Sequence, residues 1–281
     1  MKNETAKKLI ALNQKFYDEI GQYWNNSSDY VWEGWDLLFL NQVLPQMHRE
    51  LSKAENQTYS ILDLGCGNGR FGDYAWQQFQ HLAKSKSLES GMMSFVGIDF
   101  SDFYKQLFTA KFNKKSKKGL IADFIQSDLI LTDWTQEPKI QTNKFDLVTL
   151  FGLMHHVPGY QNKVNLIRRS ASVLKLGGII CFTTWQFLLE KRLVKRIVSK
   201  FSEEYSSILN QLEISDDELD KSDYILDWIK KEKGYRFSHF ISNQEAEQII
   251  SEAGLKILME YPADGRFSQT NRYYICQLES L

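Results

Sequence analysis

The stretch Asp63-Leu-Gly-Cys-Gly-Asn-Gly-Arg70 decides the fold class of this chain. It follows an apolar run over 60–64 that is typical of a buried strand, and it precedes a helical pattern over 70–82. Alternate glycines at such a junction allow a tight turn and let the backbone approach a ligand without an intervening Cβ. In an open parallel sheet, ligands bind at the carboxyl ends of the strands, where this loop lies. The sequence therefore predicts a ligand site at the end of this first strand.

Further strand-like runs alternate with helical patterns along the rest of the chain. We expect strands over 95–98, 121–125, 145–151, 179–184, 255–259 and 273–278, and helices over 102–113, 160–174 and 242–253. Strands that alternate with helices imply βαβ units and a parallel sheet covered on both faces. The predicted fold class is therefore α/β and Rossmann-like, with a mostly parallel seven-stranded sheet and helices on both faces.

Two segments lie outside this alternation. Residues 1–56 are predicted to form an N-terminal helical and aromatic cap, because Leu9, Phe16 and Ile20 recur on one helix face. Residues 57–281 are expected to form the main domain, in which 186–240 is an insertion after the fifth strand that is predicted to serve as a substrate lid or an RNA-contacting element. Within it, 191–200 is expected to be one basic amphipathic helix. Its charged side is formed by Lys191, Arg192, Lys195 and Arg196.

Composition limits the classes of function. The 281 residues carry a formal net charge of −1, which argues against a surface devoted wholly to nucleic acid. Cys66, Cys181 and Cys276 are widely separated, form no CxxC pair and indicate no metal site with the histidines. No window is apolar enough for a membrane span, and the N-terminus lacks a signal-peptide pattern. We therefore expect a cytoplasmic protein without a membrane partner.

Two cofactor classes use a glycine loop of this kind. The dinucleotide pattern G-x-G-x-x-G occurs from Gly67 to Gly72, but the strand ends before Gly65 rather than just before Gly67. The better match is an acidic residue followed by glycines at alternate positions, from Asp63 to Gly69. This pattern resembles motif I of the class I S-adenosylmethionine methyltransferases. A nearby carboxylate favours a cationic sulfonium, whereas it would disfavour a pyrophosphate.

The resemblance to the class I methyltransferases covers about residues 58–185 and implies further contacts with S-adenosylmethionine. Asp99 closes the second strand, where an acidic residue accepts the ribose hydroxyls, and Ser127-Asp128 follows the third, where the family contacts adenine. The segment 174–178 resembles the family's LxPGG turn, with Leu176 in place of proline. The implied cofactor-binding residues are Asp63, Gly65, Cys66, Gly67, Asn68, Gly69, Arg70, Asp99, Phe100, Ser101, Ser127, Asp128, Leu129, Phe151 and Gly152, with Tyr17 and Tyr23 as aromatic residues that cover the cofactor.

Outside this core, the chain is similar to the family that methylates the carboxymethyl group on the wobble uridine of transfer RNA. The similar features are the segment FYDEIGQYW over 16–24, the pair His155-His156, the pair Thr184-Trp185 and the segment YRFSHF over 235–240. The resemblance implies a tRNA substrate and, as in the eukaryotic members, a small zinc-binding activator subunit as a partner. The implied substrate contacts are Trp32, Trp185, Arg236, His239 and Arg272.

The acceptor decides whether a catalytic base is needed. A carboxylate is ionised at neutral pH and needs none, whereas a hydroxyl or amine acceptor would be helped by His155 or His156. The alternatives to RNA methylation are a small-molecule O- or N-methyltransferase with 186–240 as its lid, a dinucleotide-dependent oxidoreductase, and a non-catalytic binding module. An RNA substrate demands a basic platform around an open mouth, and a metabolite demands a closed apolar pocket.

Overall fold

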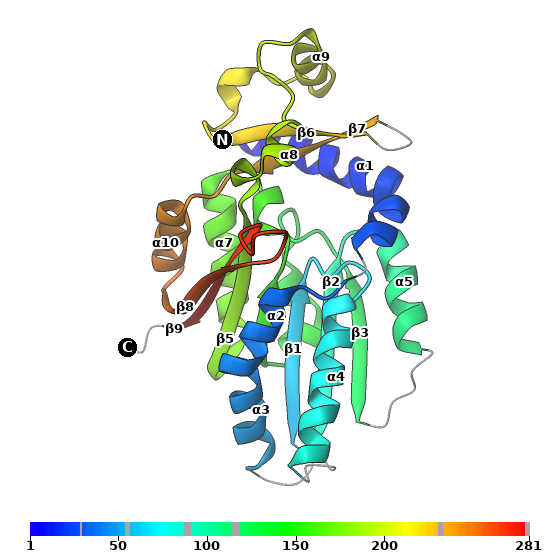
Figure 1. The fold of residues 1–281 in the computed structure, drawn as a ribbon, viewed down its shortest axis with the longest axis vertical. Coiled ribbons are helices and arrows are strands. Elements are labelled where there is room, and N and C mark those ends of the chain that lie inside the picture. The colour runs from blue at the N-terminus through cyan, green and yellow to red at the C-terminus, as the bar shows by residue number, and fades with distance from the viewer. Residues whose placement is uncertain (29, 54–56, 87–90, 114–118, 230–232, 279–281) are drawn as a thin grey trace.

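A seven-stranded sheet lies at the centre of the computed structural model, which describes residues 1–28, 30–53, 57–86, 91–113, 119–229 and 233–278 (Figure 1). The strand order is β3-β2-β1-β4-β5-β9-β8. The first five strands in this order run parallel, and β9 is antiparallel to both of its neighbours. The strands are β1 (Thr58–Leu64), β2 (Met92–Asp99), β3 (Leu120–Gln126), β4 (Phe145–Leu150), β5 (Leu174–Trp185), β8 (Leu255–Ala263) and β9 (Asn271–Leu278). The predicted fold class is confirmed.

The strand order reverses between β1 and β4. The chain runs outward from β1 through β2 to β3, and then returns to place β4 on the other side of β1. At such a switch point the loops after the two central strands diverge and leave a crevice at the carboxyl edge of the sheet. The glycine loop after β1 therefore lies at the position where this architecture binds ligands.

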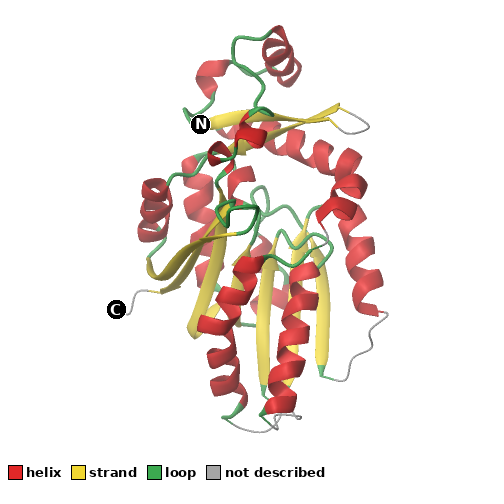
Figure 2. Ribbon diagram, in the orientation of Figure 1, coloured by secondary structure: helices red, strands yellow, loops and turns green. Residues whose placement is uncertain are grey.

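Helices cover both faces of the sheet (Figure 2). On one face, α2 (Glu33–Leu38), a π-helical turn (Phe39–Val43), α3 (Leu44–Leu51), α4 (Arg70–Ser85) and α5 (Asp102–Asn113) form one apolar core with the sheet. On the other face, α6 (Pro138–Gln141), α7 (Tyr160–Ser172) and α10 (Asn243–Glu252) form a second core. Short 3₁₀ turns lie at Trp134–Gln136, Met154–His156, Phe187–Leu189 and Asp216–Glu218.

The first helix packs away from these two cores. α1 (Asn3–Ser28) lies across the carboxyl end of the sheet together with α9 (Glu203–Leu212) and the antiparallel hairpin of β6 (Asp223–Ile229) and β7 (Lys233–His239) (Figure 1). A third apolar core joins Leu9 of α1 to Ile208, Ile225 and Phe237 of the insertion. The segment predicted as one N-terminal cap thus has two parts, since α1 packs with the insertion whereas α2 and α3 pack on the sheet. We call α1 and residues 186–240 together the roof.

The predicted basic helix over 191–200 is wrong. α8 (Lys191–Val194) is a single turn, after which Ile197 pairs with Leu226 of β6 in an isolated bridge. The N–H of Val198 donates to the carbonyl of Ile225 at 2.9 Å, and its side chain enters the third core. Pairing with β6 and burial of Val198 therefore override the helical periodicity of this stretch. In the described ranges, no helix combines the length and apolar character that a membrane crossing requires.

Candidate active site

A cavity of about 650 Å³ lies between the carboxyl edge of the sheet and the roof. Its floor consists of the loops that follow the parallel strands, and its upper wall consists of α1, the segment after β5 and the hairpin. Both walls combine aromatic and charged side chains. The described residues that line it include Gln14, Tyr17, Trp32, Asp63, Gly67, Arg70, Asp99, Tyr104, Asp128, Phe151, His155, His156, Trp185, Trp228, Arg236 and Asp264.

The glycine loop presents its backbone to this cavity. Gly65, Gly67 and Gly69 have φ values of 74°, 51° and 73°, a region that residues with a Cβ rarely adopt. A Cβ on Gly67 would meet nothing within 4 Å, whereas one on Gly69 would come within 2.7 Å of Phe108. Gly67 therefore leaves open space for a ligand, and Gly69 allows the loop to pack against α5.

Two buried carboxylates flank this loop. Asp99 accepts hydrogen bonds from the N–H groups of Gly67 at 3.0 Å and Ser101 at 3.1 Å. Asp63 accepts one from the hydroxyl of Thr149 at 2.7 Å. Burial raises the pKa of Asp63 to about 7 and that of Asp99 to about 6. Such groups favour a ligand that brings positive charge and hydroxyl donors, and they oppose a pyrophosphate.

Asp128 connects the floor of the cavity to the roof. One oxygen of its carboxylate accepts from the N–H groups of Ile130 at 2.8 Å and Leu131 at 2.7 Å. The other accepts from the side-chain amide of Gln14 on α1 at 2.8 Å. The neighbouring hydroxyl of Ser127 lies 2.8 Å from that of Thr132. The loop after β3 is thus fixed against α1 at the edge of the cavity.

An aromatic group holds Arg70 beside the glycine loop. Its guanidinium lies 4.9 Å from the ring centre of Trp32 and 5.5 Å from that of Trp35, and it donates to the carbonyl of Tyr30 at 3.2 Å. Trp35 also packs on Phe151, which follows β4. These contacts place a cation and an aromatic wall on the α2 side of the cavity.

A second aromatic and polar group lies under the roof. The hydroxyl of Tyr17 is 2.8 Å from Nε2 of His156, and the guanidinium of Arg236 lies 4.9 Å from the ring centre of Trp185. The ring of His155 packs at a tilt against the rings of His156 and Trp185, with ring centres 4.1 Å and 5.0 Å away. Burial lowers the pKa of His156 to about 3 and lowers that of His155 well below its ordinary value. Both imidazoles are therefore neutral at physiological pH.

Most of the residues singled out in the sequence line this one cavity. They are Tyr17, Trp32, Asp63, Gly65, Cys66, Gly67, Asn68, Arg70, Asp99, Phe100, Ser127, Asp128, Leu129, Phe151, Gly152, His155, His156, Trp185 and Arg236. Gly69 and Ser101 lie behind the lining, where Ser101 supports Asp99 through its N–H. Tyr23 of α1 is not among the lining residues, and Arg272 of β9 pairs instead with Glu260 at 3.1 Å.

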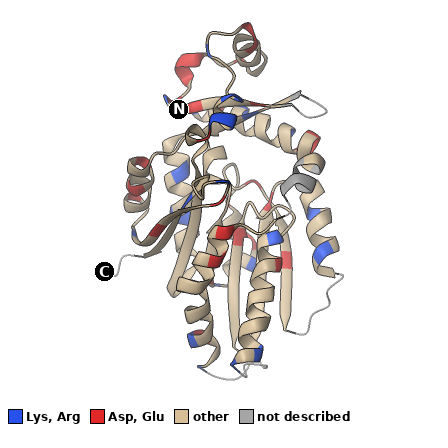
Figure 3. Cartoon of the chain, viewed as in Figure 1, with Lys and Arg blue, Asp and Glu red and all other residues tan. Residues whose placement is uncertain are grey.

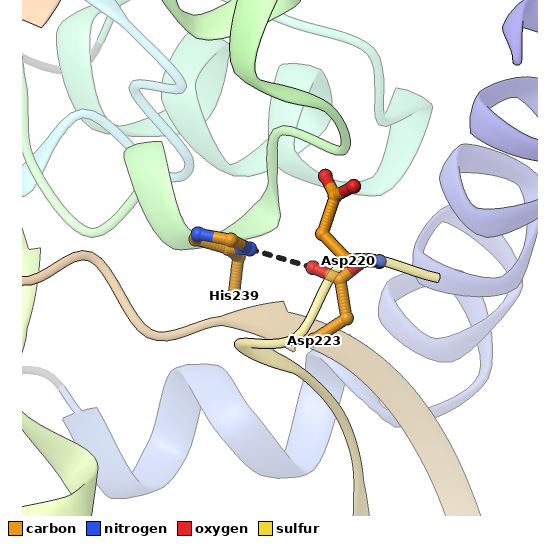
Figure 4. A group of neighbouring side chains, drawn as sticks. All are labelled: Asp220, Asp223 and His239. Carbon is orange, nitrogen blue, oxygen red and sulfur yellow. Dashed lines mark hydrogen bonds and ion pairs between the residues drawn. The ribbon is translucent and has the colours of Figure 1, made fainter. Parts of the chain in front are cut away.

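His239 also lies away from the cavity, in a buried charged network. Its Nδ1 is 2.6 Å from Asp223, and its Nε2 is 3.0 Å from Glu245. Glu245 lies 3.6 Å from Nζ of Lys163, whose side chain is fully buried. Asp220, Asp223 and His239 have the spacing of a metal-ligand group (Figure 4). Because both ring nitrogens of His239 have carboxylate partners and an ammonium group lies beside them, we interpret the group as an ion-pair network that joins β6 and β7 to α7 and α10.

Sequence reasoning missed several lining residues. Asp227 comes from the hairpin of the insertion, whose fold the periodicity did not predict. Arg192 and Arg196, which the sequence did single out, also line the cavity. Asp264 follows β8 with a φ of 66°, and its carboxylate accepts from the N–H of Gly34 at 3.0 Å. The only sequence signal at this position was the pair Asp264-Gly265, which is typical of a turn rather than of a site.

The comparisons with known proteins agree with this architecture. A family model described as a methyltransferase domain matches residues 55–254. No curated protein matches the sequence. Among solved structures, the fold is similar to an S-adenosylmethionine-dependent methyltransferase from Clostridium acetobutylicum ATCC 824, with a TM-score of 0.57, 13% identity, and 94% of this chain and 99% of that chain covered. It is also similar to magnesium protoporphyrin IX methyltransferase from Synechocystis PCC 6803 with bound SAH, with a TM-score of 0.54, 14% identity, and 97% and 99% covered.

The matched family, the fold and the carboxylates around the glycine loop define the class of protein, which is a methyltransferase. The chain belongs to this methyltransferase domain family, and it is an enzyme whose cofactor is S-adenosylmethionine. The residues at the sheet edge fit this cofactor. Gly67 leaves room for it, and Asp63 and Asp99 supply the negative charge and the hydroxyl acceptors that it requires.

Proposed function

We propose that the enzyme transfers the methyl group to a carboxylate of a small acceptor molecule, which binds between the glycine loop and the roof and leaves as a methyl ester. The observation that carries the proposal is Arg236, a residue that is only 4% exposed and lines the cavity beside Trp185. A planar guanidinium binds a carboxylate through two parallel hydrogen bonds and remains charged when buried. It would therefore hold and orient such an acceptor.

The cofactor half of the cavity is assigned to the residues around the glycine loop. Asp99 would accept from the ribose hydroxyls, Asp128 would lie by the adenine, and Asp63 and Arg70 would face the charged amino-acid end. When bound, S-adenosylmethionine would supply a methyl group to a carboxylate oxygen of the acceptor, with S-adenosylhomocysteine as the leaving group. The chain's own contribution is to align the acceptor at Arg236 and to exclude water with the roof.

The two histidines favour a carboxylate over a hydroxyl acceptor. A general base works best when its pKa lies near the working pH. Burial lowers the pKa values of both His155 and His156 well below neutral pH. Both nitrogens of His156 also have neighbours within 2.9 Å, the Tyr17 hydroxyl and the carbonyl of Phe237. A carboxylate acceptor needs no base and is compatible with these neutral imidazoles.

The roof supports a small acceptor. A cavity of about 650 Å³ is in the range of small-molecule sites, roughly 300–1,000 Å³, and its upper wall includes Leu226 and Trp228 of the hairpin. In the view of Figure 3, lysine and arginine positions are scattered among acidic ones. The cavity volume supports a metabolite, and the scattered positive charge differs from the basic platform expected above for RNA.

A second candidate is the carboxymethyl group on the wobble uridine of tRNA, with a zinc-binding activator subunit as a further proposed partner. It is favoured by four exposed cations, Lys191, Arg192, Lys195 and Arg196, of which Arg192 and Arg196 also line the cavity. Each of these two already has an acidic neighbour, Glu190 at 2.6 Å and Asp227 at 3.6 Å. For an RNA substrate, replacing all four cations by glutamate should abolish methylation and remove its steep salt dependence.

A methyl-transfer assay with tritiated S-adenosylmethionine tests the proposal. The purified protein is incubated separately with total RNA and with a small-molecule extract from the same source, and each product is treated with mild alkali. We expect label in the small-molecule fraction that alkali releases as volatile methanol, and none with Arg236→Gln. Alkali-stable label would contradict the carboxylate acceptor, and label confined to RNA would select the second candidate.

A further inference from the structure

Arg236 is the end of a chain of side chains that crosses three elements. Tyr17 comes from α1, His156 from the turn after β4, and Arg236 from β7, and all three line the cavity. The Tyr17 hydroxyl is 2.8 Å from Nε2 of His156, and Nδ1 of His156 is 2.9 Å from the carbonyl oxygen of Phe237. Tyr17 also shares a hydrogen bond with Arg236. The chain therefore runs from a backbone carbonyl through an imidazole and a phenol to a guanidinium.

The chemistry of each group gives this chain a direction. A carbonyl oxygen only accepts, so the 2.9 Å contact is a hydrogen bond only when the imidazole proton of His156 is on Nδ1. The side-chain amide of Asn13 lies farther from Nδ1, at 3.3 Å, and also donates to the carbonyl of Phe237 at 3.2 Å. A neutral imidazole with its proton on Nδ1 must accept at Nε2, so the Tyr17 hydroxyl donates to it. A guanidinium only donates, and the lone pairs of the Tyr17 oxygen are left to accept from Arg236. Each of these three contacts thus joins a donor to an acceptor when His156 is neutral.

The same arrangement leaves the positive charge on Arg236. Burial lowers the pKa of His156 to about 3 and raises the pKa of Tyr17, so the imidazole and the phenol both stay neutral. The guanidinium also lies 5.4 Å from the ring centre of Phe16 and 4.9 Å from that of Trp185, which are uncharged. These contacts orient Arg236 without adding negative charge.

We propose that His156 and Tyr17 are positioning residues, which hold the guanidinium of Arg236 in place for the anionic group of the acceptor. The inference rests on the proposed function, because it takes the acceptor to be a carboxylate. It replaces both roles that the sequence suggested, a catalytic base at His156 and a cofactor cover at Tyr17.

This chain of hydrogen bonds also makes acceptor binding depend on α1. Asn13, one turn before Tyr17, holds β7 by accepting from the N–H of Phe237 at 2.8 Å and donating to its carbonyl at 3.2 Å. α1 therefore fixes both the strand that carries Arg236 and the phenol that orients it. The acceptor site is complete only when α1 lies in its place in the roof.

The first test does not need an acceptor. In protein labelled with ¹⁵N-histidine, NMR should show His156 as the neutral form with its proton on Nδ1, unchanged down to pH 5. In Tyr17→Phe the Nε2 resonance should shift, because it loses its donor, whereas Tyr160→Phe, outside the cavity, should leave it unchanged. A proton on Nε2, or titration of His156 between pH 5 and 8, would overturn the inference whatever the substrate.

The second test uses the acceptor found in the methyl-transfer assay. Tyr17→Phe should raise the KM of the acceptor about tenfold, the value of one lost hydrogen bond to a charged group, with kcat changed much less. The Kd of S-adenosylhomocysteine and the shape of the pH profile of kcat/KM should stay as in wild type. An unchanged KM, or an equal loss of S-adenosylhomocysteine affinity, would overturn the positioning role. Alkali-stable label in wild type would instead overturn the proposed function alone.

Discussion

Asp63 and Asp99 are the two residues whose charge state should change when the cofactor binds. Burial raises their pKa values to about 7 and about 6, so both are partly protonated near pH 6. A cationic cofactor with hydroxyl donors favours the ionised forms, so its binding should lower both pKa values and release protons. The affinity for S-adenosylmethionine should therefore rise between pH 5 and pH 8. Calorimetry in buffers of different ionisation enthalpy measures the release, and a pH-independent Kd without it would contradict this assignment.

Asp99→Asn removes the negative charge of this side chain and keeps its shape. Asp99→Asn should weaken S-adenosylhomocysteine binding by about 10–100-fold, because two charge-assisted hydrogen bonds are weakened. Asp217→Asn, at an exposed position in the insertion, is the matched control and should bind as wild type does. An unchanged Kd in a folded Asp99→Asn protein would show that this carboxylate is not in the cofactor site.

The cofactor residues proposed here could be predicted because each lies at or just after the carboxyl end of a strand. Asp63, Asp99 and Asp128 meet at one edge since the carboxyl ends of parallel strands share that edge, and strands are readable from short apolar runs. The partners of His239 could not be predicted in the same way. They come from β6 and α10, and a one-dimensional pattern does not show that Asp223 and Glu245 converge on one imidazole.

At the scale of elements, the His239 network joins the hairpin of the roof to the helices on the sheet. Burial alone would lower the pKa of His239, but its hydrogen bonds to Asp223 and Glu245 outweigh this and raise it. A raised pKa contributes stability that is complete below the unfolded value of about 6.5 and is lost as pH rises through the folded value. The imidazolium therefore stabilises the attachment of the roof most at mildly acidic pH.

We state the prediction as the difference in melting temperature between wild type and His239→Gln, because other groups that titrate in the same pH range affect both proteins alike. The melting temperature of wild type should exceed that of His239→Gln by about 2–4 °C at pH 6, and the gap should close as pH rises above the folded pKa. His48→Gln, at an exposed position on α3, is the control and should leave the wild-type profile unchanged. A gap that stays constant or widens up to pH 9 would contradict a charged His239.

The fold of the insertion could not be predicted from local sequence patterns. Cations spaced at i, i+4 predicted a helix over 191–200. In the structure Ile197 instead pairs with β6, and Val198 is buried in the third core. These contacts depend on residues near 225, which no local pattern reveals. By contrast, α4, α5, α7 and α10 were predictable because each buries a face with helical periodicity against an adjacent strand.

At the scale of the whole molecule, the sheet and the roof contribute different residues to the cavity. The sheet edge carries the glycine loop and its carboxylates, and the roof carries Arg236, so the proposed cofactor half and the proposed acceptor half of the cavity face each other. α1 contacts both halves, through Gln14 to Asp128 and through Tyr17 to His156. The sequence predicted that the residues of the glycine loop and the following strand ends share one edge, but it did not predict the contact of α1 with the hairpin, which joins residues 224 positions apart.

The central claim is that the acidic edge around Asp63 and Asp99 holds a sulfonium cofactor. Isothermal titration of the wild-type protein with S-adenosylmethionine and with NAD tests it most directly. The account predicts a Kd for S-adenosylmethionine in the micromolar range, roughly −8 kcal/mol, and no heat of binding with NAD. Tight binding of NAD with no signal from S-adenosylmethionine would contradict it.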